Sequence, residues 1–432
     1  MRSVSTRALV PLLAGALLLS AAACSASAPA ADPGSVTITF SSYNYGTQGS
    51  AGTGTQALLD RFAELHPEIT VEPQSVPVAD VLTSARAATA AGEPPDVVQL
   101  GYSKLAEGLE TLPVQPLDEL AGDGWDAHVS GIVPGPVATG TRDGSTYALP
   151  YTISIPTVLY NADLFEQAGL DPDQPPATIE EVRTAATAIV GTGAEGVYFA
   201  MADPGKSDYL TQSVMNSAGG GVLDAGGTIT LDSPASVEGI RQIQSLTTDG
   251  LQPAVAVDDA MAAFTTGDLG MLVISTAVLG TVQDAAEGNF ELRTTAFPGF
   301  GSAPAAPTHS GAALVSLSED EARQRAAWEL ISFLTSEEGY QLIATEIGYL
   351  PLRQSVVEGE LAGWLEENPL LVPTIEQLDQ MQAYQSFPGP RSNQATQLLQ
   401  DEAVEPVVLR GADPQSSLTS TANRIRELVG AP

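Results

Sequence analysis

The segment ITVEPQSVPVADVLTSARAATAAGEPPDVVQL, residues 69–100, reads as a strand, a helix and a second strand. Residues 69–76 predict the first strand, and residues 78–91 predict a helix with Gly92 just beyond it. Residues 96–100, DVVQL, are a short apolar run that is typical of a buried strand. A strand–helix–strand unit of this kind is the building block of an α/β fold.

The residues before this segment repeat the pattern. In residues 35–40, SVTITF, apolar and polar side chains alternate, as they do in a strand with one buried face. In residues 55–68, TQALLDRFAELHPE, the side chains of Leu58, Phe62 and Leu65 fall on one face of a helix. Strand and helix therefore alternate over this region, which predicts an α/β fold with a mostly parallel sheet and helices on both of its faces.

The second half of the chain carries well-marked helix starts. Ser233 followed by Pro234 predicts one of them, and the glycine-rich residues 217–233 predict turns around a short hairpin. Other segments fit a capping box, in which a hydroxyl and a carboxylate three residues later satisfy free backbone N–H groups. These segments are Thr178–Glu181, Ser318–Glu321 and Thr335–Glu338.

The composition excludes several classes of protein. The 432 residues contain 17 Lys and Arg against 52 Asp and Glu, a formal net charge of −35. Nucleic-acid binding depends on basic side chains that neutralise phosphates, so we expect no nucleic-acid partner. A hydrophobic fraction of 43% excludes wholesale disorder. The roughly 400 residues beyond the N-terminal apolar stretch are too many for one core, which predicts two domains.

The N-terminus predicts export. Arg2 and Arg7 precede the apolar residues 8–23, a run too short to span a bilayer, and this order is typical of a secretory signal peptide. Cys24 is the only cysteine, so it cannot close an internal disulfide. The stretch resembles a bacterial lipoprotein signal, with Ala21 where such signals prefer leucine. The resemblance implies that Cys24 receives lipid and anchors the chain; an ordinary signal with an incidental cysteine is the alternative.

The sequence contains no convincing motif for catalysis or for a cofactor. His66, His128 and His309 lack the paired spacing of a zinc site. Residues 200–208, AMADPGKSD, end like a phosphate-binding loop but begin with alanine, and residues 171–182 lack the glycine and the last glutamate of a calcium loop. We therefore expect a binding protein without cofactor or metal. A glycosidase-type pair of carboxylates stays open, because acidic residues occur throughout the chain.

Several blocks resemble the extracellular solute-binding proteins, family 1, of ABC importers. They occur in the family's order across essentially the whole chain after the signal. Within this family, GLDPDQPPAT at 169–178 and EIGYLPLR at 346–353 are most similar to binders of glycerol-3-phosphate and glycerophosphodiesters, with oligosaccharide binders next. The blocks are YALPYTISIPTVLYNADLFEQAGLDPDQPPATIEEV at 147–182, FTTGDLGMLVISTAVLG at 264–280, HSGAALV at 309–315 and AAWELISFLTSEEGYQLIATEIGYLPLR at 326–353.

The resemblance implies a periplasmic-binding-protein-like (type II) fold. Two α/β lobes would be joined by three chain crossings, with a ligand in the central cleft that hinge closure buries. The implied boundaries are a lipoprotein signal peptide at 1–23, a flexible tether at 24–34, an N-terminal lobe at 35–150 and 313–358, and a C-terminal lobe at 151–312 and 359–432.

Candidate ligand-binding residues come from the strand ends and from the resemblance. Tyr43 and Tyr45 follow the first strand, and their aromatic faces suit sugar C–H groups or a choline cation; packing beneath the loop is the alternative. Tyr102 follows the strand at 96–100 and stands where glycerol-phosphate binders carry an acidic residue. The resemblance also implies ligand contacts for Ser154, Ser275, Gly311 and Tyr349.

Arg391, in FPGPRSNQ, is the candidate that decides the class of ligand. An arginine between a Pro-Gly-Pro turn and the start of a helix could place two parallel N–H bonds on a phosphate. A salt bridge with one of the many acids is the alternative. The decision between phosphate and salt bridge stays open at this point.

We therefore expect a lipid-anchored substrate-binding subunit of an ABC importer, without enzymatic activity, at the extracytoplasmic face of a bacterial membrane. It would capture a sugar, polyol or glycerophospho compound by hinge closure and deliver it to the permease. Two alternatives are kept: a secreted carbohydrate-active enzyme, and a binding receptor that works without a transporter.

Overall fold

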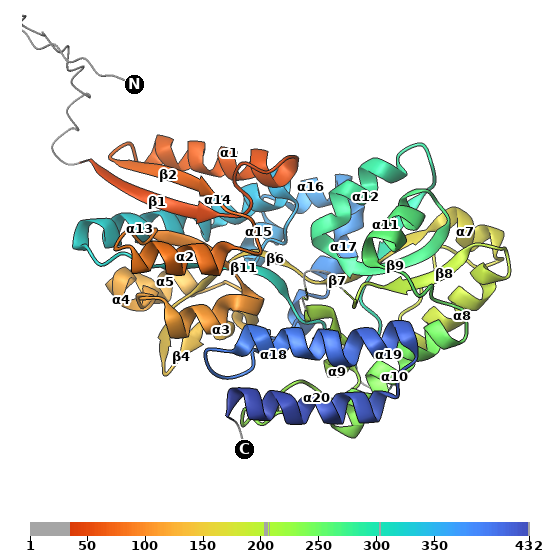
Figure 1. Ribbon diagram of the computed structural model, residues 1–432. Coiled ribbons are helices and arrows are strands. Elements are labelled where there is room, and N and C mark those ends of the chain that lie inside the picture. Colours follow the sequence, from red (N-terminus) through yellow and green to blue (C-terminus); the bar gives the residue numbers. More distant parts are fainter. Residues whose placement is uncertain (1–34, 203–205, 207, 302–303, 431–432) are drawn as a thin grey trace, which may run out of the picture. The chain divides into compact units, whose positions relative to one another are not determined.

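The computed structural model describes residues 35–202, 206, 208–301 and 304–430 (Figure 1). The predicted signal peptide, Cys24 and the tether lie outside the described residues. No helix of the described part is both long and apolar enough to cross a membrane. The chain from Val36 onward forms one unit by its contacts, and this unit contains two larger sheets and one short strand pair.

The first sheet has five strands. It contains β1 Val36–Ser42, β2 Ile69–Ser75, β3 Val97–Gly101, β6 Leu149–Ser154 and β11 Ser310–Ser316. Their order in the sheet is β2-β1-β3-β11-β6. β1 pairs with β2 and β3 in parallel, whereas β11 pairs with β3 and β6 antiparallel.

The second sheet has four strands. It contains β7 Pro156–Asn161, β8 Glu195–Phe199, β9 Leu269–Ser275 and β10 Leu292–Thr295. Their order is β10-β7-β9-β8, with β8 parallel to β9 and the other pairs antiparallel. The short pair is β4 Thr141–Arg142 with β5 Ser145–Thr146.

Each sheet has one strand that runs against the others, and the chain path explains both cases. β6 ends at Ser154 and β7 begins at Pro156, so the chain passes straight from one sheet into the other through Ile155. β7 therefore enters the second sheet at the edge where β8 and β9 end, and it must run opposite to them. β11 follows β10 in the chain and enters the first sheet at the edge where β3 and β6 end, so it must run opposite to them. Both sheets are thus mixed. Most strands of each sheet run in one direction, as predicted, but the reversed strand lies between them, so several neighbouring pairs are antiparallel.

The helices connect and cover the strands. In the first half they are α1 Ser50–Leu65, α2 Val81–Ala90, α3 Tyr102–Thr111, α4 Leu117–Ala121, α5 Trp125–Val129, α6 Pro134–Thr139, α7 Ala162–Gln167, α8 Ile179–Val190 and α9 Tyr209–Ser217. In the second half they are α10 Pro234–Thr248, α11 Val257–Thr265, α12 Leu279–Ala286, α13 Glu321–Leu334, α14 Glu337–Leu342, α15 Gln354–Glu358, α16 Ala362–Glu367, α17 Val372–Ile375, α18 Ser392–Leu398, α19 Glu405–Arg410 and α20 Pro414–Val429. Two π-helices, η3 Ile343–Ile347 and η6 Leu399–Val404, continue α14 and α18.

The helix starts test the capping predictions. Thr178 and Glu181 form the predicted capping box at α8, and Ser233 caps α10 ahead of Pro234, so both predictions are confirmed. The box predicted at Ser318 is wrong, because Asp320 caps α13. Ser318 Oγ instead donates to the buried Asp96 carboxylate at 2.7 Å.

The box predicted at Thr335 is also wrong. Ser336 caps α14 by accepting from the N–H of Gly339. Thr335 is the last residue of the preceding turn, where its hydroxyl donates to the carbonyl of Ile331 at 2.8 Å. The helix therefore begins one residue later than the predicted box, with Ser336 rather than Thr335 at the N-cap.

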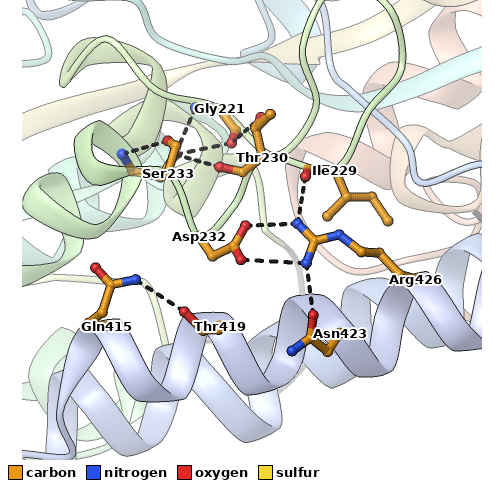
Figure 2. Close-up of polar contacts among 10 residues, drawn as sticks. Gly221, Ile229, Thr230, Asp232, Ser233, Gln415, Thr419, Asn423 and Arg426 are labelled. Atoms are coloured by element: carbon orange, nitrogen blue, oxygen red, sulfur yellow. Dashed lines mark hydrogen bonds and ion pairs between the residues drawn. The ribbon is translucent and has the colours of Figure 1, made fainter. Parts of the chain in front are cut away.

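The C-terminal helix α20 is held by a charged pair that Figure 2 shows. Arg426 places both terminal nitrogens of its guanidinium on the Asp232 carboxylate, at 2.9 and 3.4 Å, and donates to the carbonyl of Ile229 at 2.9 Å. Asp232 and Ile229 belong to the glycine-rich segment, whose predicted hairpin is present as an antiparallel bridge between Leu223 and Ile229. A planar guanidinium suits this double contact, so α20 is fixed in position against the start of α10.

Candidate functional site

The two sheets meet at their strand ends. β1, β3 and β6 end, and β11 begins, along one edge of the first sheet, and β8 and β9 end along the edge of the second sheet where β7 begins. Three hydrogen bonds join the edges. Ser275 Oγ donates to Ser154 Oγ at 2.8 Å, and Ile155 exchanges bonds with Thr276, at 3.0 Å through its carbonyl and 3.4 Å through its N–H.

Tyrosine side chains gather at the edge of the first sheet. Tyr43 follows β1, and its hydroxyl lies beside Thr152 and Gln99, with Tyr349 close by. Burial is the main reason that the pKa of Tyr43 is raised, and the neighbouring Tyr349 raises it further. Burial also raises the pKa of Tyr349 to about 12. Both hydroxyls therefore stay protonated at neutral pH and can donate as well as accept hydrogen bonds.

A buried amide organises the polar side chains at this edge. The carboxamide oxygen of Gln99 accepts from Ser42 Oγ at 2.6 Å, and its nitrogen donates to Thr152 Oγ1 at 3.1 Å. These three side chains are fully buried. The sequence analysis missed Gln99 and Thr152; the available signal was a glutamine inside the otherwise apolar run DVVQL, since buried polar groups need partners.

A histidine that was not predicted as a site residue lies against Tyr102. Tyr102 is the buried first residue of α3, and its ring meets the ring of His309 edge to face at a centroid distance of 4.3 Å. His309 Nε2 accepts from the backbone N–H of Tyr384 at 3.1 Å. Burial lowers the pKa of His309 to about 3, so the ring is neutral near pH 7 and carries its proton on Nδ1.

Some buried polar atoms at these strand ends have no hydrogen-bond partner. Within the residues that the structure describes, these include Asn44 Nδ2, Tyr102 Oη and His309 Nδ1. Leaving such a group unpaired costs about 1–3 kcal/mol. All three atoms are enclosed by the fold, so a solute does not reach them in this arrangement.

Gly311 has a structural reason to be glycine. Its φ is 104°, and a Cβ atom built there would lie 1.8 Å from the carbonyl oxygen of Thr152 in the neighbouring strand β6. The residue sits opposite Ile153 in the β6–β11 pair, next to a register shift. Only a residue without a side chain allows the two backbones to approach this closely.

The structure brings six of the eight candidate residues to the two facing edges. These six are Tyr43, Tyr102, Ser154, Ser275, Gly311 and Tyr349. Tyr45 is half-buried against the core, and its backbone N–H donates to Ser42 Oγ at 3.1 Å. Within the described part of the chain, no hydrogen bond or ring contact joins the Tyr45 side chain to the other six.

Arg391 is the N-cap residue of α18, and no hydrogen bond in the described part of the chain joins its side chain to the six. Its side chain is exposed, and it makes no ion pair with any of the described residues. The salt bridge considered as its alternative role is therefore absent from the described part of the chain. α18 packs against α3, the helix that begins with Tyr102, so Arg391 precedes a helix that contacts one wall of the site.

A cavity of about 250 Å³ lies next to the facing edges. Gly348 and Ala277 line the cavity. Gly348 directly precedes Tyr349 in the sequence, and Ala277 follows Ser275 by two residues. None of the eight candidate residues itself lines the cavity. Among the described residues there is no group of three or more His, Cys, Asp or Glu side chains placed to hold a metal ion.

The sequence and the fold of this chain are similar to those of known proteins. The family model described as bacterial extracellular solute-binding protein matches residues 45–341. The chain is 25% identical to the sn-glycerol-3-phosphate-binding periplasmic protein UgpB of Pectobacterium atrosepticum over 399 residues, which are 88% of this chain and 89% of that protein. It is 28% identical to UgpB of Brucella melitensis over 313 residues, 67% of this chain and 69% of that protein.

Solved structures are similar over nearly the whole chain. UgpB from Mycobacterium tuberculosis in complex with glycerophosphocholine is 26% identical with a TM-score of 0.78, covering 92% of this chain and 99% of that one. The cyclic alpha-maltosyl-1,6-maltose binding protein from Arthrobacter globiformis is 22% identical with a TM-score of 0.80, at the same coverage. The second likeness shows the fold alone.

Proposed function

The chain belongs to the bacterial extracellular solute-binding protein family, and from this premise we propose that it captures a glycerophospho compound, or else a sugar or polyol, and delivers it to the permease of an ABC importer. Members of this family are binding receptors rather than enzymes, so the solute is not converted. The α/β fold with two mixed sheets is the one found in periplasmic binding proteins.

The observation that carries the proposal is the meeting of the two sheets at strand ends that carry partly exposed hydroxyl side chains. A solute that contacts Tyr43 or Tyr349 on the first sheet and Ser275 on the second would contact both sheets at once. Such a solute favours a closed arrangement only through the contacts it gains there. We place the hinge at the Ser154–Pro156 crossing and at the two later passages between the sheets, near 304–309 and 358–371.

The lobe boundaries follow from these crossings. We propose a first lobe built on the β2-β1-β3-β11-β6 sheet and a second built on the β10-β7-β9-β8 sheet. β6 and β11 lie whole within the first sheet, so the proposed boundary at residue 150 moves to Ile155 and the one at 312 moves to about 309.

Arg391 supports a phosphate-bearing solute. Its guanidinium is exposed and unpaired within the described residues, and a guanidinium can donate two parallel N–H bonds to a phosphate. UgpB of Mycobacterium tuberculosis binds glycerophosphocholine in its solved complex, and that protein is similar along nearly all of this chain. Tyr102 stands where the resemblance places an acidic ligand residue of glycerol-phosphate binders, which is why a sugar or polyol is kept as the alternative solute.

The location of the protein involves export from the cytoplasm, which is common to the family, and a proposed lipid anchor. The family is extracellular or periplasmic. We propose in addition that Cys24 is lipidated and holds the protein at the extracytoplasmic face of the cell membrane, beside the permease that it supplies. Several acyl chains, each contributing about 0.8 kcal/mol per buried CH₂, would be enough for stable anchoring.

A thermal-shift screen tests the proposed function. Glycerol-3-phosphate, glycerophosphodiesters, sugars and polyols are added to the purified protein, and a solute at a hundredfold excess over its Kd should stabilise the folded form by about 2.7 kcal/mol. Arg391→Ala should abolish the shift from phosphate-bearing solutes and keep that from neutral ones. Arg325→Ala, which removes another exposed arginine, on α13, is the matched control. Loss of both kinds of shift in Arg391→Ala alone would reject the phosphate role, and no shift with any solute would reject the proposed function.

A further inference from the structure

The cavity of about 250 Å³ beside the site is lined by residues other than the candidate site residues. At roughly 30 Å³ per water molecule, it has room for about eight waters, or for one small organic group. Its lining comes from the N-terminus of α1, from the π-helix η3, from the start of α12 and from the segment 364–371. π-helical turns are frequent at functional sites, and residues 344–347 of η3 line this cavity.

One wall of the cavity is rigid. α1 packs so closely on η3 that a Cβ atom at Gly54 would lie 2.6 Å from Ile347 and 2.8 Å from the backbone of Glu346. Ser50 Oγ donates to the carbonyl of Ile347 at 3.3 Å, which ties the start of α1 to the end of η3. This wall therefore needs no rearrangement to receive a bound group.

The lining mixes apolar and polar side chains, and its charged residues are acidic. Ile347, Leu279, Leu371 and the half-buried Trp364 supply apolar surface. Glu346 and Glu367 are exposed, and within the described residues neither carboxylate pairs with a basic side chain. No Lys, Arg or His is among the described residues that line the cavity.

A neighbouring hollow extends the negative surface. It shares Gln283 and Leu370 with the cavity and adds Asp284 and Glu287, again without a basic residue among those described. Anions are therefore repelled on both sides of Gln283. An indole attracts a cation through its ring face, carboxylates attract it through charge, and the apolar part of the lining accommodates alkyl groups.

We propose that this cavity binds a small organic cation whose charged nitrogen carries alkyl groups. The inference goes beyond the proposed function, because it stands whether or not the facing sheet edges bind the transported solute. The cation occupies the space between Trp364 and the two carboxylates, Glu346 and Glu367.

Gly280 offers a way to fill the cavity without disturbing the fold. It lines the cavity within helix α12, and a Cβ atom added there would meet nothing within 4 Å. Leucine is also a better helix former than glycine. The matched control is Gly363→Leu, because Gly363 is likewise helical with open space around its Cβ but does not line the cavity.

The probes are choline and its uncharged carbon isostere, 3,3-dimethylbutan-1-ol, measured by isothermal titration calorimetry. We expect choline to bind the purified protein two- to fivefold more tightly than the isostere, which is the range of a cation–π contact. Gly280→Leu should weaken choline binding at least tenfold, and Gly363→Leu should leave it within twofold of wild type. Glu367→Gln should reduce the preference for choline over the isostere.

Several results would overturn the proposal: no choline binding, equal affinity for the isostere, or a Gly280→Leu variant that binds choline as the control does. Thermal melting of each variant verifies folding. Glycerol-3-phosphate, which carries no cation, separates the two proposals. A shift with a solute but no choline binding removes only the cavity proposal, whereas choline binding without any solute shift removes only the proposed function.

Discussion

His309→Gln tests the electrostatics of the buried site. His309 is fully buried, and desolvation lowers its pKa from 6.5 to about 3. Its Nε2 accepts the N–H of Tyr384 at 3.1 Å, and the amide oxygen of glutamine can accept the same bond. The substitution therefore removes a group that can be protonated while it keeps the hydrogen bond.

The magnitude follows from the pKa difference between the folded and the unfolded chain. Below pH 6.5 the unfolded chain binds a proton at His309 that the folded chain excludes until about pH 3, so the free energy of unfolding falls as the pH falls through this window. One pKa unit corresponds to about 1.4 kcal/mol. Between pH 7 and pH 4 the loss from His309 is therefore about 3 kcal/mol.

Asp208 has the opposite effect on the pH dependence of stability, and it is linked to His309 through Tyr384. It accepts from the hydroxyl of Tyr384, the residue whose N–H bonds His309, and burial raises its pKa to about 6. The folded chain keeps this proton up to about pH 6 and the unfolded chain only up to about 3.8, so stability rises as the pH falls through this window. The gain between pH 7 and pH 4 is about 2 kcal/mol, which offsets most of the His309 loss in the wild type.

Urea unfolding at pH 7 and pH 4, followed by circular dichroism, measures the difference. We expect the change in free energy of unfolding between the two pH values to differ by about 3 kcal/mol between wild type and His309→Gln. His66→Gln, at a histidine outside the site, controls for the loss of an imidazole. If His309→Gln and wild type respond to pH within 1 kcal/mol of each other, His309 is not a neutral buried group and the reasoning fails.

Three further substitutions test contacts that stabilise the fold. Gly311→Ala should destabilise the protein by about 3 kcal/mol or more, because φ is 104° and the new Cβ would lie 1.8 Å from the Thr152 carbonyl oxygen; an unchanged melting temperature would contradict this. Thr178→Ala should cost about 1 kcal/mol in urea unfolding, because it removes one half of the capping box of α8, and a cost near zero would show that the box is dispensable. Arg426→Lys should release α20 to faster proteolysis, because an ammonium cannot place two parallel N–H bonds on Asp232; equal cleavage rates would reject the anchoring role.

The sequence predicted the secondary structure well where local periodicity decides it. The alternation in residues 35–40 and the helical face of residues 55–65 correspond to β1 and most of α1. The capping box at Thr178 also depends only on residues within one helical turn, and it is present. The box at Ser318 was predicted wrongly, because Asp320 caps α13 and Ser318 Oγ donates to Asp96, 222 positions away. No local pattern contains that partner.

The candidate site was predictable in outline. Residues just after a strand lie at a sheet edge, which is why Tyr43, Tyr102 and Ser275 meet where the sheets face each other. Tyr45 also follows β1, but its side chain packs on the core. His309 was not predicted as a site residue, since a single histidine in a sequence gives no indication of its burial or of its ring contact with Tyr102.

The sequence by itself determined which segments are strands and helices and which side chains stand at strand ends, because periodicity and turn chemistry act over a few neighbouring residues. Only the tertiary structure decided that β7 and β11 run against their sheets, since this depends on where the chain enters each sheet. It also decided which polar groups are paired. The hydrogen bonds of Gln99, Ser154 and His309 join residues 53 to 170 positions apart, and the atoms left without partners become known only when such distant segments have packed.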